Sequence, residues 1–203
     1  MNELDKLRSG LIKYIPDEAV NIVSTYLYKN PIQLTITKPR LTKLGDYRPP
    51  HSKKFHRISV NSDLNQYHFL WTLVHEIAHF ETFVEYSHSV KPHGVEWQAS
   101  FSELIEPFIL KDVFPDEISP LLIKHIDKPK ASSCSDPKIY KAFSSLNIKQ
   151  GLFLDDLPLG SIFKFGNNVF QKGEKKRTRY LCSKVDNKEK YLVHGIAEVE
   201  LIA

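Results

Sequence analysis

The sequence predicts an α+β fold: a helical region with a small layer of strands, followed by a small β module. Two observations lead to this prediction. Apolar residues recur at helical spacing through most of the first 110 positions, interrupted by an alternating run at 32–37. After Gly151 the pattern changes to short alternating runs separated by turn-forming residues. A chain of 203 residues, 41% of them apolar, is long enough to bury a core.

The N-terminal part predicts two helices and then strands. Apolar residues recur at helical spacing in 4–12, and a second helix is expected from Pro16 to near Asn30, with proline and acids in its first turn. Ile32–Thr37 alternates apolar and polar residues, which predicts a strand with one buried face. The basic segment that follows predicts a loop or a second edge, and residues 57–60 predict a further short strand.

The strongest helical pattern comes next. Asp63 and Gln66 are expected to cap a helix whose apolar positions recur up to about Tyr86. Residues 87–94 break this pattern. A further helix follows them and is expected to bend or end at Pro107.

The C-terminal part predicts a linker and a β module. Residues 127–138 are poor in large apolar side chains, as linkers are. We therefore expect a first domain at 1–126, a linker at 127–150 and a β module at 151–203. In that module, strands are expected at 161–165, 169–172, 178–185 and 190–202.

Composition excludes several classes of protein. Only two cysteines are present, Cys134 and Cys182, so neither a disulfide-rich mini-protein nor a four-cysteine metal site is expected. No run approaches the roughly 20 apolar residues that cross a bilayer, and the N-terminus lacks the features of a secretion signal. We therefore expect a cytoplasmic protein with no membrane partner. Without a phosphate-binding loop or a dinucleotide fingerprint, no nucleotide cofactor is expected.

The segment His75-Glu76-Ile77-Ala78-His79 lies on the long predicted helix and carries the chemistry. Histidines four residues apart lie on one helix face, so both imidazoles can bind one Zn²⁺ ion at about 2.0–2.1 Å. Glu76 then stands beside the open coordination position, where a carboxylate takes a proton from zinc-bound water as it attacks a carbonyl. Apolar flanks place these polar groups on a buried helix, which favours a metal site over chance spacing. We predict one zinc ion and peptidase chemistry.

Zinc needs a third protein ligand if its fourth position is left for water. His68 lies about 10 Å along the helix from His75, which is too far for the same ion, and is expected to be a partly exposed helix residue. Two carboxylates of the following helix and two loop histidines are candidates: Glu96, Glu103, His88 and His93. His93 is preferred, because the chain leaves the loop there and can turn its ring back against the first helix.

The HExxH segment, followed after thirteen residues by His93-Gly94-Val95-Glu96-Trp97, resembles the SprT-like metalloprotease family, which includes the Spartan proteases that degrade proteins crosslinked to DNA. Segments 40–47 and 56–61 resemble the short strands that precede the metal helix in that family. The resemblance covers about residues 30–110. It implies a zincin-like metalloprotease domain with Glu76 as general base, and it removes His88 and Glu103 from the ligand candidates. The zinc ligands that it implies are His75, His79 and His93.

The last third departs from the family's pattern. Many SprT-like chains carry a C-terminal zinc ribbon with four cysteines, whereas only Cys182 stands in a comparable β context here. A second zinc ion is therefore not expected. We predict a ribbon-like β module without metal, with Cys182 as a small buried residue. Alternating apolar residues are expected to form its core. They are Phe163, Phe165, Val169, Leu181, Tyr191 and Val193.

Two basic stretches favour a nucleic-acid partner, because Lys and Arg on turn-rich β segments can neutralise phosphates. Residues 38–57 hold seven Lys or Arg against one acid, and residues 164–190 hold nine against three. Tyr47 and Phe55 interleave with the first stretch and are candidates for stacking on unpaired bases. The expected partner is DNA, single-stranded in particular. The candidate contacts are Arg40, Lys43, Arg48, Lys53, Lys54, Arg57, Lys175, Lys176, Arg177 and Arg179.

These patterns favour a zinc-dependent endopeptidase that acts on proteins bound or crosslinked to DNA. A second hypothesis is a non-proteolytic, zinc-containing adaptor that binds nucleic acid or takes part in transcription. A third is a general peptidase with no nucleic-acid role. The sequence assigns no second group that stabilises the oxyanion.

Overall fold

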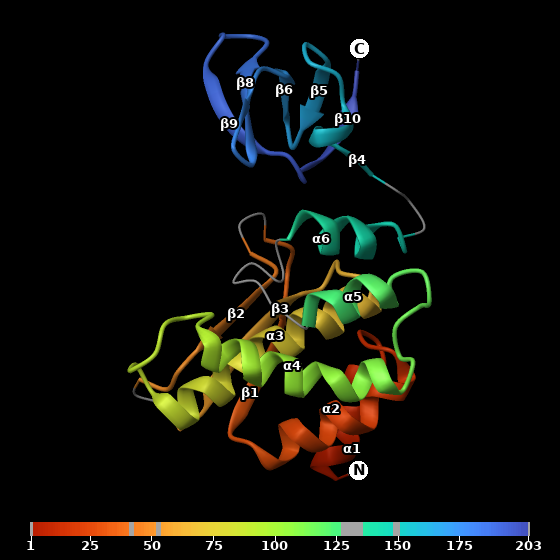
Figure 1. The fold of residues 1–203 in the computed structure, drawn as a ribbon, viewed down its shortest axis with the longest axis vertical. Helices are drawn as coiled ribbons and strands as arrows, with labels where there is room; N and C mark the ends of the chain where they lie inside the picture. Colours follow the sequence, from red (N-terminus) through yellow and green to blue (C-terminus); the bar gives the residue numbers. More distant parts are fainter. Residues whose placement is uncertain (1, 41–42, 52–53, 127–135, 148–150, 203) are drawn as a thin grey trace. The chain divides into compact units, whose positions relative to one another are not determined.

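The computed structural model describes residues 2–40, 43–51, 54–126, 136–147 and 151–202, and the chain divides into two compact units, Met1–Phe143 and Ser144–Ala203 (Figure 1). The described residues are mixed α and β, which agrees with the predicted α+β class. The first unit contains a small sheet made of β1 (Ile32–Thr37), β2 (Gly45–Arg48) and β3 (His56–Asn61). Its helices are α1 (Glu3–Leu11), α2 (Asp17–Lys29), α3 (Gln66–Tyr86), α4 (Val95–Leu110), α5 (Ser119–Ile126) and α6 (Pro137–Ser144), whose last residue begins the second unit.

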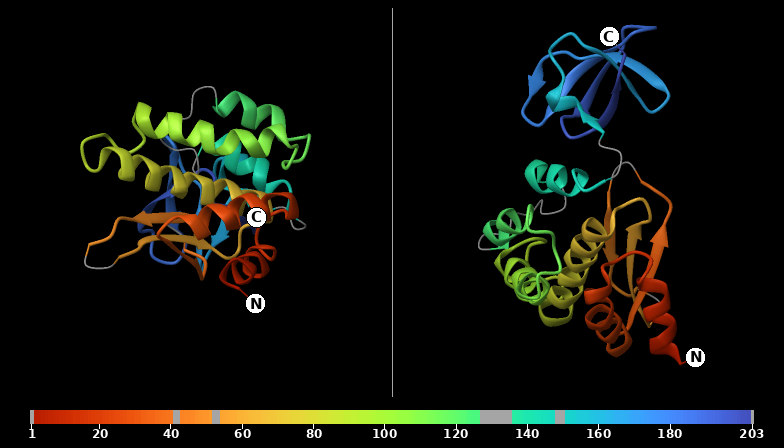
Figure 2. Two further views of the ribbon diagram at one scale, coloured as in Figure 1. Left: turned by 90° about the horizontal axis from the view of Figure 1, so that it is seen from below. Right: turned by 90° about the vertical axis from the view of Figure 1, so that its right-hand side faces the viewer.

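The three strands lie in the order β1-β3-β2, with β1 parallel and β2 antiparallel to the central β3. Ile58 and Val60 of β3 are fully buried. Figure 2 shows α3 between this sheet and α4. The edge that the sequence left undecided between loop and strand is therefore a strand, β2, and it lies beside α3.

Helix α3 is buried on nearly all sides, with 13 of its 21 residues buried. Such a helix needs apolar partners on every side, which the sheet and α4 supply in part. Its N-cap is Asn65, whose side chain accepts a hydrogen bond from the backbone N–H of His68 at 3.0 Å. The predicted cap at Asp63 was therefore wrong by two residues.

Helix α4 continues three residues past Pro107, where a bend or an end was expected. Its buried residues, Trp97, Phe101, Ile105 and Phe108, follow each other at spacings of four, four and three and line one face. Proline removes one backbone hydrogen bond, and the packing of this face stabilises the remaining turn.

The linker predicted at 127–150 is partly folded. Within it, α6 buries Ile139 and Phe143, and the Phe143 carbonyl accepts a hydrogen bond from the Asn65 side chain at 2.8 Å. The Phe143 ring stacks on His68 at a centroid distance of 4.9 Å, so His68 is buried and not partly exposed as expected. Positions 127–135 and 148–150 lie outside the described residues.

The second unit is a seven-stranded antiparallel sheet with a short 3₁₀ helix, η1 (Leu154–Asp156). Strand β9 pairs with β8, and the other strands follow the order β4-β10-β5-β6-β8-β7. The run predicted as one strand at 190–202 is divided into two strands at Gly195. The strands are β4 (Leu152–Phe153), β5 (Ile162–Phe165), β6 (Asn168–Gln171), β7 (Lys175–Lys176), β8 (Arg179–Lys184), β9 (Lys190–His194) and β10 (Glu198–Leu201).

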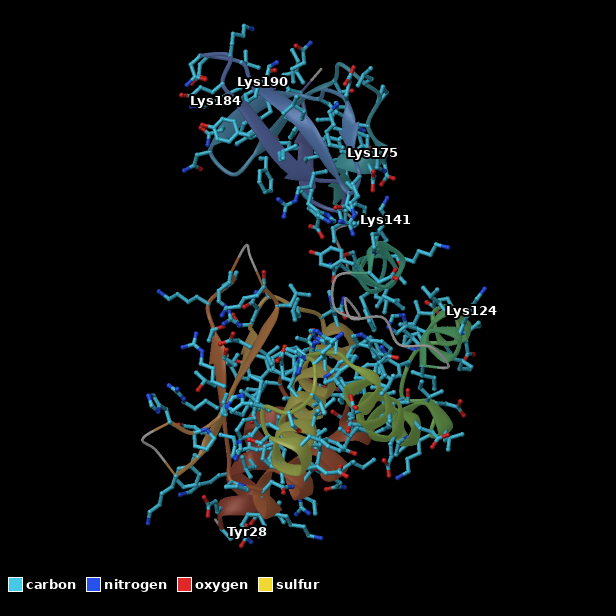
Figure 3. All side chains as sticks on the ribbon, turned by 60° about the vertical axis from the view of Figure 1, so that its left-hand side comes forward. Tyr28, Lys124, Lys141, Lys175, Lys184 and Lys190 are labelled. Carbon is cyan, nitrogen blue, oxygen red and sulfur yellow. The ribbon has the colours of Figure 1, made fainter. Side chains whose placement is uncertain are left out.

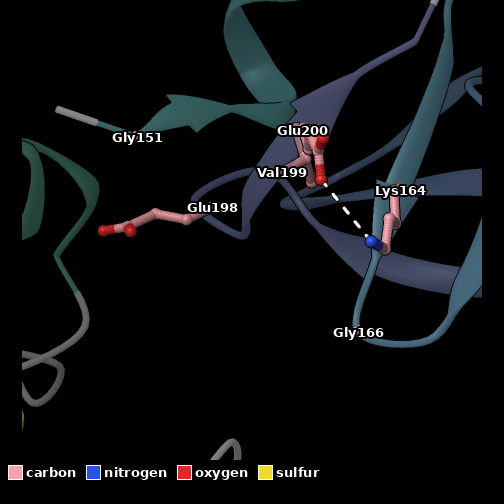
Figure 4. Close-up of a pocket in the computed structure, with 6 residues that line it drawn as sticks. All are labelled: Gly151, Lys164, Gly166, Glu198, Val199 and Glu200. Atoms are coloured by element: carbon pink, nitrogen blue, oxygen red, sulfur yellow. Dashed lines mark ion pairs between the residues drawn. The ribbon is translucent and has the colours of Figure 1, made fainter. Parts of the chain in front are cut away.

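The core of the second unit contains Phe163, Phe170, Tyr180, Cys182 and Val193. Cys182 is completely buried, as predicted. Phe163 and Val193 are in this core as predicted, and Phe165 packs against it. Val169 and Leu181 instead lie on the opposite faces of β6 and β8, and Tyr191 is exposed. A hollow of about 380 Å³ lies beside β10, and Lys164 forms an ion pair with Glu200 there at 3.7 Å. Figure 4 shows the residues that line it.

Candidate functional site

Three histidines converge at one end of the contact between α3 and α4. His75 and His79 lie one turn apart on α3, and His93 comes from the loop before α4. Nε2 of His93 lies 3.2 Å from Nε2 of His75 and 3.0 Å from Nε2 of His79. Nitrogens bound to one tetrahedral zinc ion at 2.0–2.1 Å lie about 3.3 Å apart, so the three imidazoles fit a single ion.

The electrostatic environment also suits a metal. Burial lowers the pKa of all three imidazoles, that of His79 to about 4, which keeps their nitrogen lone pairs free for a cation. Within the part of the chain that the structure describes, no other group of three His, Cys, Asp or Glu side chains converges in this way.

The backbone of the loop directs His93 toward α3. His93 has a φ of 62°, in the left-handed region that costs a residue with a side chain roughly 1–3 kcal/mol. Two hydrogen bonds hold this conformation. The Gly94 N–H donates to the Lys91 carbonyl at 2.9 Å, and the Gln98 side chain donates to the His93 carbonyl at 3.2 Å.

Trp97 packs against all three rings. Its centroid lies 4.6 Å from that of His75, 5.4 Å from that of His79 and 4.7 Å from that of His93. The indole is fully buried and stacks on Phe101 at 5.2 Å. One aromatic side chain of α4 therefore fixes the positions of the three imidazoles relative to one another.

The side chain of Glu76 projects from α3 toward the edge strand β2 and is buried there. A Cβ placed on Gly45 would lie 2.4 Å from Oε1 of Glu76, so only glycine leaves room for the carboxylate here. The backbone N–H of Tyr47 donates a hydrogen bond to it. Burial raises the pKa of Glu76 to about 8, and the charge of Asp46 acts in the same direction. A cation bound by the neighbouring histidines lowers this pKa again.

Tyr47 connects the strand to the histidines. Its ring stacks on His79 with a centroid distance of 6.3 Å and an angle of 13°. Its hydroxyl lies 2.8 Å from Nδ1 of His56, a buried side chain of β3, in a hydrogen bond. This tyrosine, proposed from the sequence as a base-stacking residue, therefore packs on a candidate metal ligand.

The other ligand candidates do not join the cluster. His88 is exposed and meets Phe83 edge-on at 5.1 Å. Glu103 is exposed on α4, and the carboxylate of Glu96 lies beside Gly94. Among the described residues, His93 alone of the four candidates approaches both histidines of α3.

Comparison with known families agrees with this geometry. A sequence model of the SprT-like family matches residues 25–113, a stretch that contains the three histidines and Glu76. Over this stretch the first unit is similar to the SprT-like family. SprT-like proteins are in general zinc metallopeptidases, which is consistent with a metal held by the histidine cluster. No curated protein and no solved structure matches the chain. No helix within the described ranges combines the length and the apolar character needed to span a bilayer.

The basic residues predicted as nucleic-acid contacts in the first unit differ in how far their donors are already used within the protein. The Arg40 guanidinium donates to Asn61 at 2.8 Å and to Ser59 at 3.0 Å, so its donors are used within the protein. Lys43 and Arg48 both bind Asp46 at 2.7 Å, and the Arg48 side chain stays 58% exposed, so it remains open to a ligand. Of the other candidate nucleic-acid contacts, Lys54 is exposed to solvent and Arg57 is half-buried. Lys53 lies outside the described residues.

In the second unit the four predicted contacts gather on one hairpin. Lys175 and Lys176 of β7 face Tyr180 and Arg179 of β8, and Arg177 in the turn has a φ of 57°. Lys175 binds Asp155 at 2.8 Å and Lys176 binds Glu174 at 3.2 Å. Figure 3 labels Lys175 on this unit. The hairpin is exposed, as expected for a surface that could neutralise phosphates.

Sequence reasoning missed three features of the site. Gly45 gave no signal, because its role depends on a contact with Glu76 across 31 positions. The packing of Trp97 under the histidines was not predicted, although its spacing of four from His93 places it one turn into the next helix. The bond between Tyr47 and His56 depends on strand register, which the sequence left open.

Proposed function

We propose that the protein is a zinc-dependent metalloendopeptidase and that its substrates are proteins bound or crosslinked to DNA. The observation that supports the first part is the convergence of three imidazole Nε2 atoms beside the buried Glu76, within the stretch similar to the SprT-like family. The hairpin at Lys175–Arg179 supports the second part, as an exposed surface with positive charge.

In this proposal His75, His79 and His93 hold the ion. Bound zinc supplies a Lewis acid that polarises the scissile carbonyl and acidifies water. Glu76 accepts the proton of the attacking water on its carboxylate and delivers it to the nitrogen of the leaving amine. The Tyr47 backbone N–H and the space left by Gly45 hold this carboxylate in place. Trp97 keeps the ligand rings in position and excludes water from their inner side.

The variant Glu76→Gln tests the proposal. It keeps the size and the hydrogen-bonding oxygen of the side chain but cannot accept the proton, so cleavage should fall by about 10²–10⁴-fold. Zinc content, measured by elemental analysis, should stay near one ion per chain. His93→Ala is the complementary variant and should lose zinc as well as cleavage.

The substrate decides between the hypotheses. Cleavage should be measured on a protein crosslinked to single-stranded DNA and on the same protein without DNA. Faster cleavage of the crosslinked form supports the proposal, and equal rates favour a general peptidase. If the wild-type protein binds zinc and DNA and cleaves neither substrate, the protein is the non-proteolytic adaptor.

A further inference from the structure

The two faces of strand β2 carry different chemistry. Side chains alternate along a strand, so Gly45 and Tyr47 face α3 and Glu76, whereas Asp46 and Arg48 face the opposite side of the sheet. On that outer face lies a hollow of about 190 Å³. It is lined by Thr35, Arg40, Asp46, Arg48, Arg57, Ile58 and Ser59.

Two arginines stand directly opposite each other in this hollow. Arg48 of β2 and Arg57 of β3 are register partners in the antiparallel pair. Like charges in such positions repel each other and destabilise the sheet. Asp46 offsets this repulsion only in part, because its carboxylate binds Arg48 at 2.7 Å and Lys43 at the same distance. The hollow therefore keeps an excess of positive charge.

Arg57 also carries an unused donor. Its Nε is buried and finds no hydrogen-bond acceptor among the residues that the structure describes. A buried N–H without a partner costs free energy, so it is normally paired with a protein group, water or a ligand. Arg57 thus lines the hollow with a charge, and its Nε stays buried behind it without a partner.

The rest of the hollow is rigid. Arg40 donates to Asn61 and to Ser59 Oγ, so its guanidinium is a fixed charge beside the two opposed arginines. Ser59 accepts from Arg40 and keeps its own proton to donate, and Thr35 lies next to it across the strands. Guanidinium groups and hydroxyl donors around a small hollow suit an oxyanion such as phosphate.

We propose that this outer-face hollow binds a phosphate group, with Arg48 and Arg57 as its principal contacts. The phosphate removes the repulsion between the two arginines by placing negative charge between their guanidinium groups. Its source is either free phosphate or the backbone of a nucleic acid, which present the same oxygens. The site needs neither zinc nor the residues of α3, so it stands whether or not the protein is a peptidase.

Titration with inorganic phosphate at constant ionic strength tests the site. Calorimetry should give a dissociation constant for the wild-type protein that rises about tenfold or more in Arg48→Gln and in Arg57→Gln. Lys29→Gln, at the exposed end of α2, is the matched control and should bind phosphate like the wild type. Equal binding by all four proteins, or no binding by the wild type, would overturn the proposal.

A stability measurement separates lost binding from lost folding. In phosphate-free buffer Arg57→Gln should unfold at the same temperature as the wild type or a higher one, because the like-charge pair is gone. Added phosphate should then raise the melting temperature of the wild type and of Lys29→Gln but not that of Arg57→Gln. If phosphate raises all of them equally, the proposed site does not exist.

A short oligothymidylate identifies the source of the phosphate. If it competes with inorganic phosphate and binds more weakly to the Arg48→Gln and Arg57→Gln variants, the hollow takes the nucleic-acid backbone. If its binding is the same in these variants while phosphate binding falls, the ligand is free phosphate. Both results support a phosphate site. If neither probe is sensitive to the two arginines, the proposal fails.

Discussion

At the scale of single residues, Gly45 is the position where strand β2 leaves room for a carboxylate. The nearest atoms to a Cβ there all belong to Glu76, at 2.4–2.9 Å. Glu76 comes from a buried helix that packs on the strand, so the carboxylate has little freedom to move away. The placement of the proposed general base therefore depends on a residue that has no side chain.

Gly45→Ala should displace the Glu76 carboxylate. We expect a loss of about 1–3 kcal/mol in the free energy of unfolding, as for other overpacked sites, and a larger proportional loss of peptidase activity. Chemical denaturation and a cleavage assay measure the two effects. Gly10→Ala is the control: Gly10 lies in α1 with open space around it, so alanine should stabilise the protein by roughly 0.5–1 kcal/mol.

Tyr47 should contribute to metal affinity through its ring more than through its hydroxyl. Tyr47→Phe removes the bond to His56 and should cost about 1 kcal/mol of stability while the stack on His79 remains. Tyr47→Leu removes both contacts and should weaken zinc binding by about tenfold or more. Competition with a chromophoric chelator measures this affinity. Equal zinc affinity in the two variants would show that the stack does not position His79.

At the scale of elements, the contact between α3 and α6 depends on an uncharged histidine. His68 stacks on Phe143, meets Tyr140 edge-on at 5.3 Å and is buried. Burial lowers its pKa to about 3 in the folded protein, against 6.5 in the unfolded chain. Below pH 6.5 the unfolded chain binds a proton that the folded protein does not, so stability is lost as the pH falls toward 3.

Stability should therefore decrease on acidification through His68. Between pH 7 and pH 5 this group should remove about 2 kcal/mol from the free energy of unfolding. His68→Phe keeps the stack and removes the titration, so its stability should fall less than that of the wild type over this range. Urea denaturation of both proteins at the two pH values gives the loss of stability of each. The other buried histidines contribute equally to both losses, so the difference between the losses belongs to His68. Parallel curves for both proteins would contradict this account.

The spacing of apolar residues along the sequence predicted most of the helices and strands near the histidine cluster. The spacing of apolar residues located α2, β1, β3 and α3 to within one or a few residues, and the histidine pair on α3 was read directly from the sequence. Helix α6 was missed, because it follows a polar segment and is stabilised by contacts with His68 and Asn65, far away in the chain. Contacts of this kind leave no periodic signal.

Predictions of strand faces in the second unit were correct in part. Phe163, Val193 and Cys182 lie in the core as expected, whereas Val169 and Leu181 give way to their neighbours Phe170 and Tyr180. A shift of one residue moves every side chain to the other face, so a short run with apolar residues on both faces leaves the choice to the packing of the whole sheet.

At the scale of the whole molecule, the two units can be followed separately. The chain has two tryptophans, Trp71 and Trp97, and both are buried in the first unit. Tryptophan fluorescence therefore reports unfolding of the first unit, whereas the circular dichroism of the chain reports both units.

A substitution of the buried Lys172 tests whether the two units unfold independently. Its ammonium donates to the carbonyls of Leu154 and Leu157, each at 2.6 Å, and lies 3.9 Å from the centre of the Tyr180 ring. Lys172→Met should destabilise the second unit by about 3 kcal/mol, because these carbonyls lose their donor. The transition seen by circular dichroism should shift and that seen by fluorescence should not.

The control for this experiment is Lys190→Met, on the exposed side of β9, which should leave both transitions unchanged. A shift of the fluorescence transition in Lys172→Met would show that the two units unfold together.

The ammonium of Lys172 also gives the second unit an internal cation that is covalently attached to the chain. A chelating agent can strip a bound ion from histidines, but it cannot extract a lysine. Treatment with EDTA should therefore act on the first unit only and leave the fold of the second unit, with its exposed basic hairpin, unchanged.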